Sequence, residues 1–208
     1  MKTRIILFLL LTFFATGCAH WLEVDQLPPG SDDFLPSEVG LLIPAILEPI
    51  DVRENGEVLE PSQEFTRLVL QKIQRTHVFL EVSSAVESGQ IKERKKAVKL
   101  ELSLDASIDT NQATNLLKFS AICASLFILR PVLYLSDDFD VTAMLKAIRH
   151  DGAEKYYRGR FKGTINYRLF GAMQAEREAR EEAIQKLLNS LMKQIMRDVN
   201  YFAMEEGV

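Results

Sequence analysis

The stretch VKLELSLDASID, residues 98–109, alternates apolar and polar side chains along its whole length. Successive side chains of an extended strand point to opposite faces, so this stretch predicts a strand with one buried face and one face in water. The same alternation returns in RFKGTINYRL, residues 160–169. Residues 140–150 are a further strand candidate, and Asp151-Gly152 favours a tight turn that leads into the last strand. The three segments together predict an antiparallel meander.

A helix and two shorter strands are expected before this meander. The apolar run at residues 39–47 contains Pro44, which cannot donate to a strand ladder and therefore suits a strand end. A polar loop through residues 54–56 follows, and Pro61 suits the first position of a helix of about fifteen residues. Val78–Val82 is the second strand candidate. The apolar side chains that recur at helical spacing are Phe65, Leu68, Val69 and Ile73.

The chain closes with a long predicted helix, roughly residues 172–202. Its first half is charged and rich in alanine, so we expect that half to extend beyond the sheet into solvent. The order of the elements predicts an α+β fold: a two-layer α/β sandwich with a mostly antiparallel sheet of about five strands and two helices on one face. The apolar stripe that should cover the sheet is Ile184, Leu187, Leu188, Leu191, Met192, Ile195, Met196 and Val199.

Composition limits the class of protein. A chain of 208 residues with 47% hydrophobic side chains can bury one core, and we expect a single α/β domain at residues 39–205. The net charge is −4, and removal of residues 1–17 would leave 23 basic and 29 acidic side chains. An acidic balance argues against a nucleic-acid partner, because nucleic-acid binding needs a basic face.

The N-terminus has the three parts of a secretion signal. Met1 to Arg4 carries two positive charges, residues 5–14 are apolar apart from Thr12, and small residues follow up to Cys18. An apolar run of about ten residues is roughly 15 Å long as a helix, which is too short to cross about 30 Å of hydrocarbon as a permanent anchor. The segment therefore predicts export of the chain.

Residues 15–18, Ala-Thr-Gly-Cys, resemble the lipobox of bacterial lipoproteins, although that family more often has Leu at the first of these places. The resemblance implies cleavage after Gly17, which removes residues 1–17, and a diacylglyceryl group and an N-acyl chain on Cys18. Ala19, where an inner-membrane lipoprotein tends to have Asp, implies the outer membrane, with the domain facing the periplasm. An ordinary signal peptide with an incidental cysteine and a short uncleaved anchor are the alternatives.

Residues 18–38 predict a linker between the lipid and the domain, because Pro, Gly, Ser and Asp are frequent at its centre, residues 28–33. Four large apolar side chains interrupt this composition. We expect them to dock on the domain, with the membrane interface as the alternative; they are Trp21, Leu22, Phe34 and Leu35.

No motif in the sequence has the spacing of a catalytic or metal site. His20, His77 and His150 are scattered, and no His or Cys pair has metal-ligand spacing. The glycines of residues 159–163 resemble a phosphate loop, but they lie on an alternating strand, which uses its amides in the ladder. Cys123 is a lone thiol in an oxidising compartment and is expected to be buried, without a disulfide. We therefore predict no enzymatic activity, no metal and no cofactor beyond the acyl chains.

The most unusual segment of the mature chain is the apolar run at residues 119–129, between Lys118 and Arg130. A run of this length is too short to cross a bilayer as a helix. We favour a buried segment that joins two strands, because Pro131 and residues 132–135 resemble the start of a core strand. The alternative is an exposed element that enters the membrane or docks on a partner. Its contact residues would be Phe119, Ile122, Leu126, Phe127, Ile128 and Leu129.

The order of a strand that ends near Pro44, a helix, and residues 79–82, Phe-Leu-Glu-Val, is similar to the opening of envelope-lipoprotein domains of the LPS-assembly-like and curli-secretion-like types. Together with the lipobox, this resemblance implies an outer-membrane lipoprotein with a non-enzymatic structural or assembly role in a cell-envelope complex. The expected partners are membrane lipid and an envelope protein. The alternative function is a periplasmic carrier of lipid or another apolar ligand, and a hydrolase is the weakest option.

Overall fold

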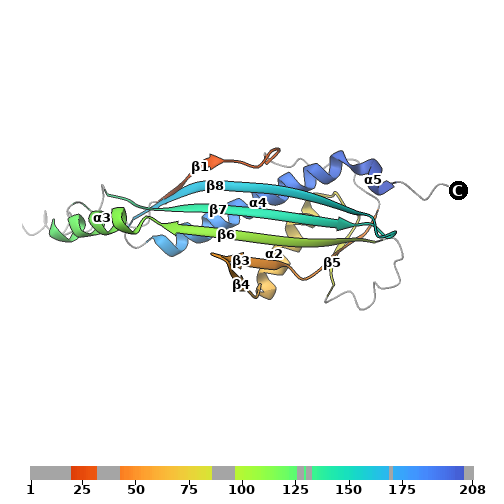
Figure 1. Cartoon of the computed structure of the whole chain (residues 1–208), viewed down its shortest axis with the longest axis horizontal. Helices are drawn as coiled ribbons and strands as arrows, with labels where there is room; N and C mark the ends of the chain where they lie inside the picture. The colour runs from red at the N-terminus through yellow and green to blue at the C-terminus, as the bar shows by residue number, and fades with distance from the viewer. Residues whose placement is uncertain are drawn as a thin grey trace, which may run out of the picture. The chain divides into compact units, whose positions relative to one another are not determined.

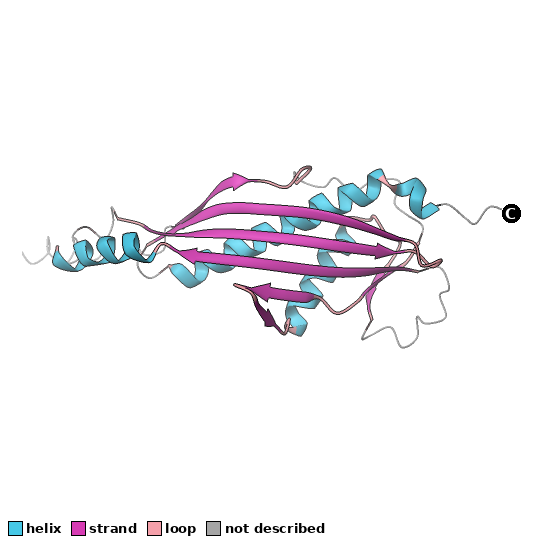
Figure 2. Ribbon diagram, viewed as in Figure 1, coloured by secondary structure: helices cyan, strands magenta, loops and turns pink. Residues whose placement is uncertain are grey.

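The computed structural model describes residues 20–31, 43–85, 97–125, 129, 133–168 and 171–203. Within these residues the fold is mixed α/β, with one sheet of eight strands and four helices (Figures 1 and 2). The predicted mixture of helices and sheet is confirmed. The sheet is larger than the predicted five strands, because short strands form in segments that the sequence pattern marks as loop and linker.

Three long strands form the predicted meander: β6 (Val98–Thr110), β7 (Leu135–Ile148) and β8 (Glu154–Tyr167). They are neighbours in the order β8, β7, β6, and β6 and β7 run in opposite directions (Figure 2). A tight turn joins β7 to β8, with Gly152 at a φ of 85°. The buried side chains of β6 are Val98, Leu100, Leu102 and Leu104, as the alternation predicts.

Contacts within the chain group its residues into two compact units. The first unit comprises residues 1–25, 108–139 and 162–182, and the second comprises residues 26–107, 140–161 and 183–208. β6, β7 and β8 therefore contribute residues to both units. The single domain predicted for residues 39–205 stays a prediction.

In the second unit a short strand, β2 (Ala45–Leu47), lies between β6 and β5 (Val82–Ser84). Both pairings are parallel, with Ala45 opposite Val82 on one side and Val98 on the other. The strand begins directly after Pro44 instead of ending there, which corrects the prediction, and the Pro44 carbonyl accepts a hydrogen bond from the Val98 amide at 3.0 Å. The strand predicted at Val78–Val82 is displaced along the chain, because Phe79 forms an isolated bridge and the continuous strand is Val82–Ser84.

The predicted loop at residues 54–56 is the turn of a hairpin between β3 (Asp51–Glu54) and β4 (Glu57–Leu59). Asn55 and Gly56 have φ values of 51° and 85°. Asn-Gly tolerates this left-handed pair, which matches the twist of a two-residue hairpin. β3 also pairs with β6 in parallel, so the hairpin extends the sheet.

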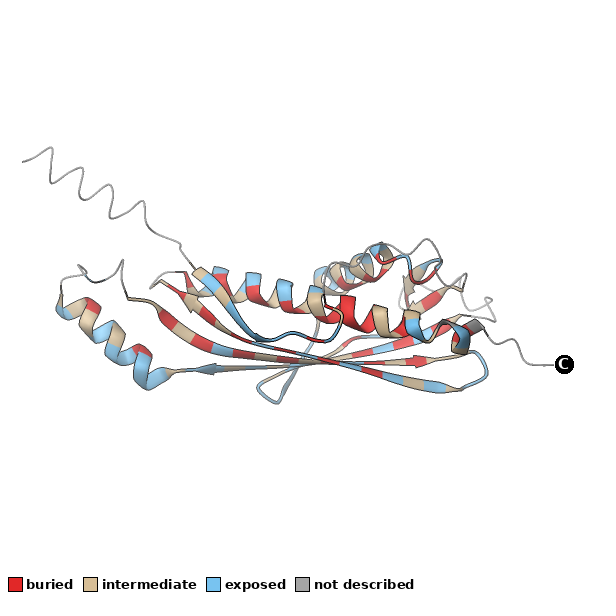
Figure 3. Cartoon of the chain, turned by 90° about the horizontal axis from the view of Figure 1, so that it is seen from above, coloured by how far each residue is buried: buried red, intermediate tan, exposed pale blue. Residues whose placement is uncertain are grey.

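Helix α2 (Gln63–Arg75) begins after Ser62, whose hydroxyl accepts a hydrogen bond from the Phe65 amide at 3.1 Å. Ser62 is therefore the N-cap, and Pro61 precedes the helix instead of occupying its first position. Two of its predicted apolar side chains, Val69 and Ile73, are fully buried. Figure 3 shows α2 on the same side of the second unit's strands as residues 183–197 of the closing helix.

The closing helix is α4 (Ala172–Arg197), and a turn at Asp198 separates it from α5 (Val199–Ala203). The expectation that its first half extends into solvent is wrong, because Ala175 and Ala179 are buried. Alanine lets a helix approach its neighbours closely, so a face without large apolar residues still packs. The buried part of the predicted stripe is Leu187, Leu188, Leu191, Met192 and Ile195.

Part of the predicted linker at residues 18–38 is a strand, β1 (His20–Gln26), which pairs with β8. Gly163 of β8 makes this approach possible, since a Cβ at that position would meet the Glu23 carbonyl oxygen at 2.6 Å. In the second unit the Ser190 hydroxyl donates to the Pro29 carbonyl at 2.6 Å, so the segment after β1 also packs on the fold. Residues 32–38 lie outside the described part of the chain.

Candidate interaction surface on helix α3

The apolar run predicted as a core segment contributes to helix α3 (Gln112–Ala124) in the first unit. The side chains of Leu116 and Leu117 are 65% and 73% exposed, and Phe119 and Leu129 are also exposed. Of the three predicted contact residues that the structure describes, Phe119, Ile122 and Leu129, only Ile122 is buried, and completely so. The favoured prediction of a core segment is therefore wrong for most of the described residues. Leu126, Phe127 and Ile128 lie outside them.

A network of buried polar groups joins α3 to the strands of the first unit. The side-chain amide of Asn115 donates to the Ser136 carbonyl at 3.0 Å and to Asp137 Oδ1 at 3.1 Å. The Ser136 amide donates back to Asn115 Oδ1 at 3.0 Å. The Tyr167 hydroxyl donates to Asp137 Oδ2 at 2.7 Å. This network fixes α3 by one face, near its first turn.

The environment of Tyr167 keeps its hydroxyl a donor. Burial raises the pKa of Tyr167, and its hydrogen bond to Asp137 raises that pKa further. The Asp137 side chain is almost completely buried, and it receives hydrogen bonds from Tyr167 and Asn115. Buried carboxylates need such donors, because an unpaired one would lose its hydration without compensation.

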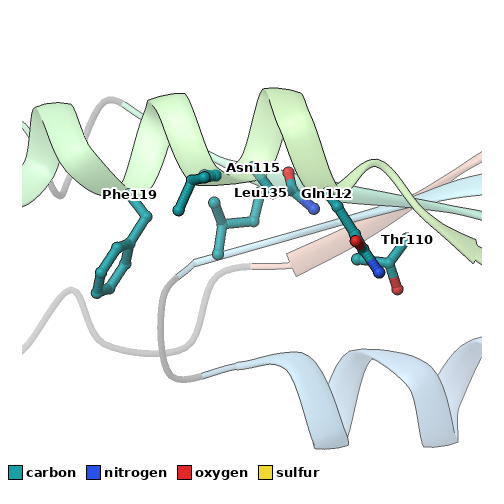
Figure 4. A pocket seen from close by; sticks show the side chains of 6 residues that line it. Thr110, Gln112, Asn115, Phe119 and Leu135 are labelled. Atoms are coloured by element: carbon teal, nitrogen blue, oxygen red, sulfur yellow. The ribbon is translucent and has the colours of Figure 1, made fainter.

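A groove of about 410 Å³ opens beside α3, with Leu135 of β7 between the helix and the strands. Figure 4 shows Phe119, Asn115 and Gln112 along the helix side of this groove and Thr110 at the end of β6. The groove is mainly apolar. Its lining residues are Thr110, Gln112, Asn115, Leu116, Phe119 and Leu135.

The start of β1 is held close to this groove through Trp21. The Trp21 and Tyr134 rings pack edge to face with centroids 4.5 Å apart. The guanidinium of Arg168 donates to the Tyr134 hydroxyl at 3.1 Å and lies over the Tyr134 ring. Tyr134 directly precedes Leu135, which lines the groove. Trp21 thus contacts the folded unit, as predicted, while its side chain stays partly exposed.

A hydrogen-bond contact with α4 holds the first residue of β1. His20 Nε2 lies 2.6 Å from Glu178 Oε2 on α4. A hydrogen bond from Gln174 and the contact with His20 lower the pKa of Glu178. The three groups lie in the first unit, beside a cavity of about 120 Å³ that Trp21 and Leu22 also line.

Cys18 and Gly17, the predicted residues of lipid attachment and signal cleavage, lie outside the described residues. Cys123 is half-buried on α3, so the prediction of a fully buried thiol is wrong. The described residues contain no group of three or more His, Cys, Asp or Glu side chains that could hold a metal ion. Among them, too, no helix has the length and apolarity needed to cross a membrane.

Sequence reasoning missed the polar network around Asp137. The alternation of β7 is the signal that could have found it, because it places Asp137 on the same face of the strand as Leu135 and Phe139. A carboxylate on a buried face requires donors from other elements. Asn115 and Tyr167 supply them, but their pairing with Asp137 depends on the sheet order, which the pattern does not contain.

The chain is thus a mixed α/β protein in which helix α3 exposes apolar side chains beside a groove.

No family model matches the chain, and no curated protein matches it. Two solved structures are similar over most of the chain. A neuraminyllactose-binding hemagglutinin homolog from Helicobacter pylori is 12% identical with a TM-score of 0.46, covering 81% of this chain and 93% of its own. A dodecameric PelC variant from Paraburkholderia phytofirmans is 8% identical with a TM-score of 0.33, covering 84% and 96% respectively.

Proposed function

We propose that the chain is an outer-membrane lipoprotein with a non-enzymatic structural or assembly role in a cell-envelope complex. The observation that carries the proposal is the sequence of residues 15–18, which resembles a lipobox directly after a signal-like segment. The fold is compatible with attachment there, because β1 begins at His20, two residues after Cys18. The exposed apolar side chains of α3 supply a surface for a contact outside the chain.

The acyl chains explain retention at the membrane without a spanning helix. Each buried methylene contributes about 0.8 kcal/mol to membrane binding, so several acyl chains on Cys18 would hold the chain essentially permanently. The thioether would form on the Cys18 thiol of the precursor, and the N-acyl group would form on the α-amine that cleavage after Gly17 frees. The lipid would thus provide location, and the folded units would provide the contacts.

Replacement of the anchor residue tests the proposal. In Cys18→Ser we expect an unprocessed precursor that retains residues 1–17 and carries no acyl mass, so that its size and its partitioning between detergent and water differ from those of the wild type. The matched control is Cys123→Ser, which removes the other cysteine and should leave processing, mass and partitioning as in the wild type. Identical behaviour of Cys18→Ser and the wild type would refute lipid attachment.

A second function, transport of an apolar ligand, is favoured by one observation, the largely apolar groove beside α3. Native mass spectrometry of the lipidated protein in mild detergent separates the two functions. A stoichiometric protein partner supports the assembly role. Non-covalent lipid bound without protein, and lost in Phe119→Asp, supports the carrier.

A further inference from the structure

We propose that α3 lies in the interfacial region of the same bilayer that holds the acyl chains, with Leu116 and Leu117 immersed among the lipids. The inference rests on the proposed lipid attachment at Cys18 and names what covers the exposed side of α3. Contact with a protein partner would then fall on other faces of the chain.

The helix is oriented with its apolar side outward. At 3.6 residues per turn, the buried residues Asn115 and Ile122 share one face. The opposite face is uncharged and exposed, and it consists of Ala113, Leu116, Leu117, Ser120 and Ala124. A surface helix of a water-soluble protein normally has the reverse arrangement, with its apolar stripe on the core. The polar network at Asn115 fixes the orientation, so this outward face cannot turn inward to the strands.

The charge pattern around α3 suits a lipid surface. Residues 111–135 contain no Asp or Glu, although the chain has 29 acidic residues in all. Lys118 and Arg130 are the charged residues of this segment. Lys118 lies on the side of the helix toward Ile122, away from Leu116 and Leu117. A segment with basic but no acidic residues is attracted by anionic headgroups and not repelled by them, and Lys118 keeps its charge off the side that Leu116 and Leu117 occupy.

The length of α3 excludes a spanning position. Thirteen residues extend about 20 Å at 1.5 Å per residue, against about 30 Å of hydrocarbon. A helix of this length that contacts a bilayer lies in the interface, so Leu116 and Leu117 would face the acyl boundary.

The connection to the anchor favours the bilayer over other occupants. Cys18 and His20 are two residues apart, so an extended chain separates them by at most about 7 Å. β1 and α3 belong to the same compact unit. A chain of contacts links them, because Trp21 packs on Tyr134 and the adjacent Leu135 lines the groove with Leu116 and Phe119. A short tether keeps this unit at the membrane surface, where contact between α3 and lipid is effectively intramolecular.

Nitroxide labels in the lipidated full-length protein test the proposal. The label is attached to Leu117→Cys in a Cys123→Ser background and reconstituted in vesicles of phosphatidylethanolamine and phosphatidylglycerol. The matched control is Val58→Cys, an exposed apolar position on β4 in the second unit. We expect the label at residue 117 to collide more with oxygen and less with a water-soluble nickel chelate on reconstitution. At residue 58 we expect no such change.

Other outcomes overturn this inference separately from the proposed function. A label at residue 117 that stays accessible to the nickel chelate, in protein that floats with the vesicles, refutes the α3 inference and leaves lipid attachment intact. Spin–spin broadening at residue 117 would place a second copy on α3, and loss of collisions with both reagents would place a protein there. Protein that fails to float refutes lipid attachment itself.

A second variant gives an independent measurement. The unlipidated mature chain is obtained as Cys18→Ser with residues 1–17 removed. In this chain, Leu117→Asp should weaken binding to the same vesicles by about tenfold or more, as expected for the loss of one leucine buried in lipid. Val58→Asp should leave binding unchanged. Equal effects of the two substitutions would contradict the proposal. Both positions are exposed, so circular dichroism should show the same fold for both variants.

Discussion

At the scale of single residues, Asp137 determines how α3 is attached. Its carboxylate accepts hydrogen bonds from Asn115 at 3.1 Å and from Tyr167 at 2.7 Å. The alternation of β7 contains enough information to place Asp137 on a buried face, but not to identify its donors. These come from residues 22 and 30 positions away along the chain, and only the strand order brings them together. The exposed Leu116 was missed for a related reason, because an apolar side chain by itself favours the core.

Removal of the Tyr167 hydroxyl should destabilise the fold. Tyr167→Phe leaves Asp137 with one donor fewer in a buried site, so we expect the free energy of unfolding to fall by about 1–3 kcal/mol. Urea denaturation measures this difference. Tyr156→Phe is the matched control, since Tyr156 also donates to a carboxylate, Glu154, but is exposed to water. Its effect should stay within about 0.5 kcal/mol, and equal losses in both variants would contradict the importance of burial.

The turn between β7 and β8 should make stability depend on pH. Hydrogen bonds from the Arg149 guanidinium, and from the Ala153 amide, lower the pKa of Asp151. A carboxyl with a lowered folded-state pKa stabilises the fold at neutral pH, and this contribution is lost as the pH falls through that pKa. The wild type should therefore melt above Asp151→Asn at pH 7, and the difference in melting temperature should narrow as the pH falls below the ordinary pKa of an aspartate. Melting temperatures of both proteins from pH 7 to pH 2 measure this difference. A difference that stays constant over this range would contradict the lowered pKa of Asp151.

At the scale of elements, regular patterns were predictable and short pairings were not. The alternation in β6 and the apolar stripe of α4 each identify an element, because many residues repeat one period. β2 and β5 have three residues each, too few for a period to show. The hairpin of β3 and β4 could have been predicted from Asn55-Gly56, whose preference for left-handed φ is local. β1 could not, because its pairing depends on the space that Gly163 leaves.

A methyl group at Gly163 should displace β1. In Gly163→Ala the new Cβ would meet the Glu23 carbonyl oxygen at 2.6 Å, and backbone cannot move aside cheaply. We expect faster hydrogen exchange at the β1 amides, measured by mass spectrometry of the intact fold. Gly159→Ala in the same strand is the control, since its Cβ would meet the end of the Leu187 side chain at 3.0 Å. That side chain can rotate, so exchange in β1 should stay as in the wild type.

At the scale of the whole molecule, composition predicts a folded chain, and the order of the predicted elements predicts its mixed α/β class. Composition does not predict where the fold begins. The proline-rich residues 28–31 look like a linker, yet Pro28 and Ser31 are buried in the second unit. Proline and glycine mark turns, and a turn can be packed as well as solvated. Composition likewise does not predict that α3 lies on the surface.

Truncation at the N-terminus should show where the fold begins. An unlipidated chain that starts at His20 should melt at the temperature of the unlipidated chain that starts at residue 18. Removal of residues 20–31 deletes β1 and the Pro29 acceptor of the buried Ser190 hydroxyl. We expect a drop of roughly 2–4 °C for each kcal/mol lost, measured by differential scanning calorimetry. Equal melting temperatures for the two truncated chains would show that residues 20–31 are dispensable.

The position of β1 also has a mechanical consequence. In the proposed anchored state, any pull between the membrane and the rest of the complex enters the fold at His20. β1 is the edge strand at one end of the sheet, and it pairs with β8. Tension would therefore load the β1–β8 ladder and the His20–Glu178 contact before it reached the buried side chains. Under strain the outer strand should peel first, which would lengthen the tether while the remaining structure stays intact.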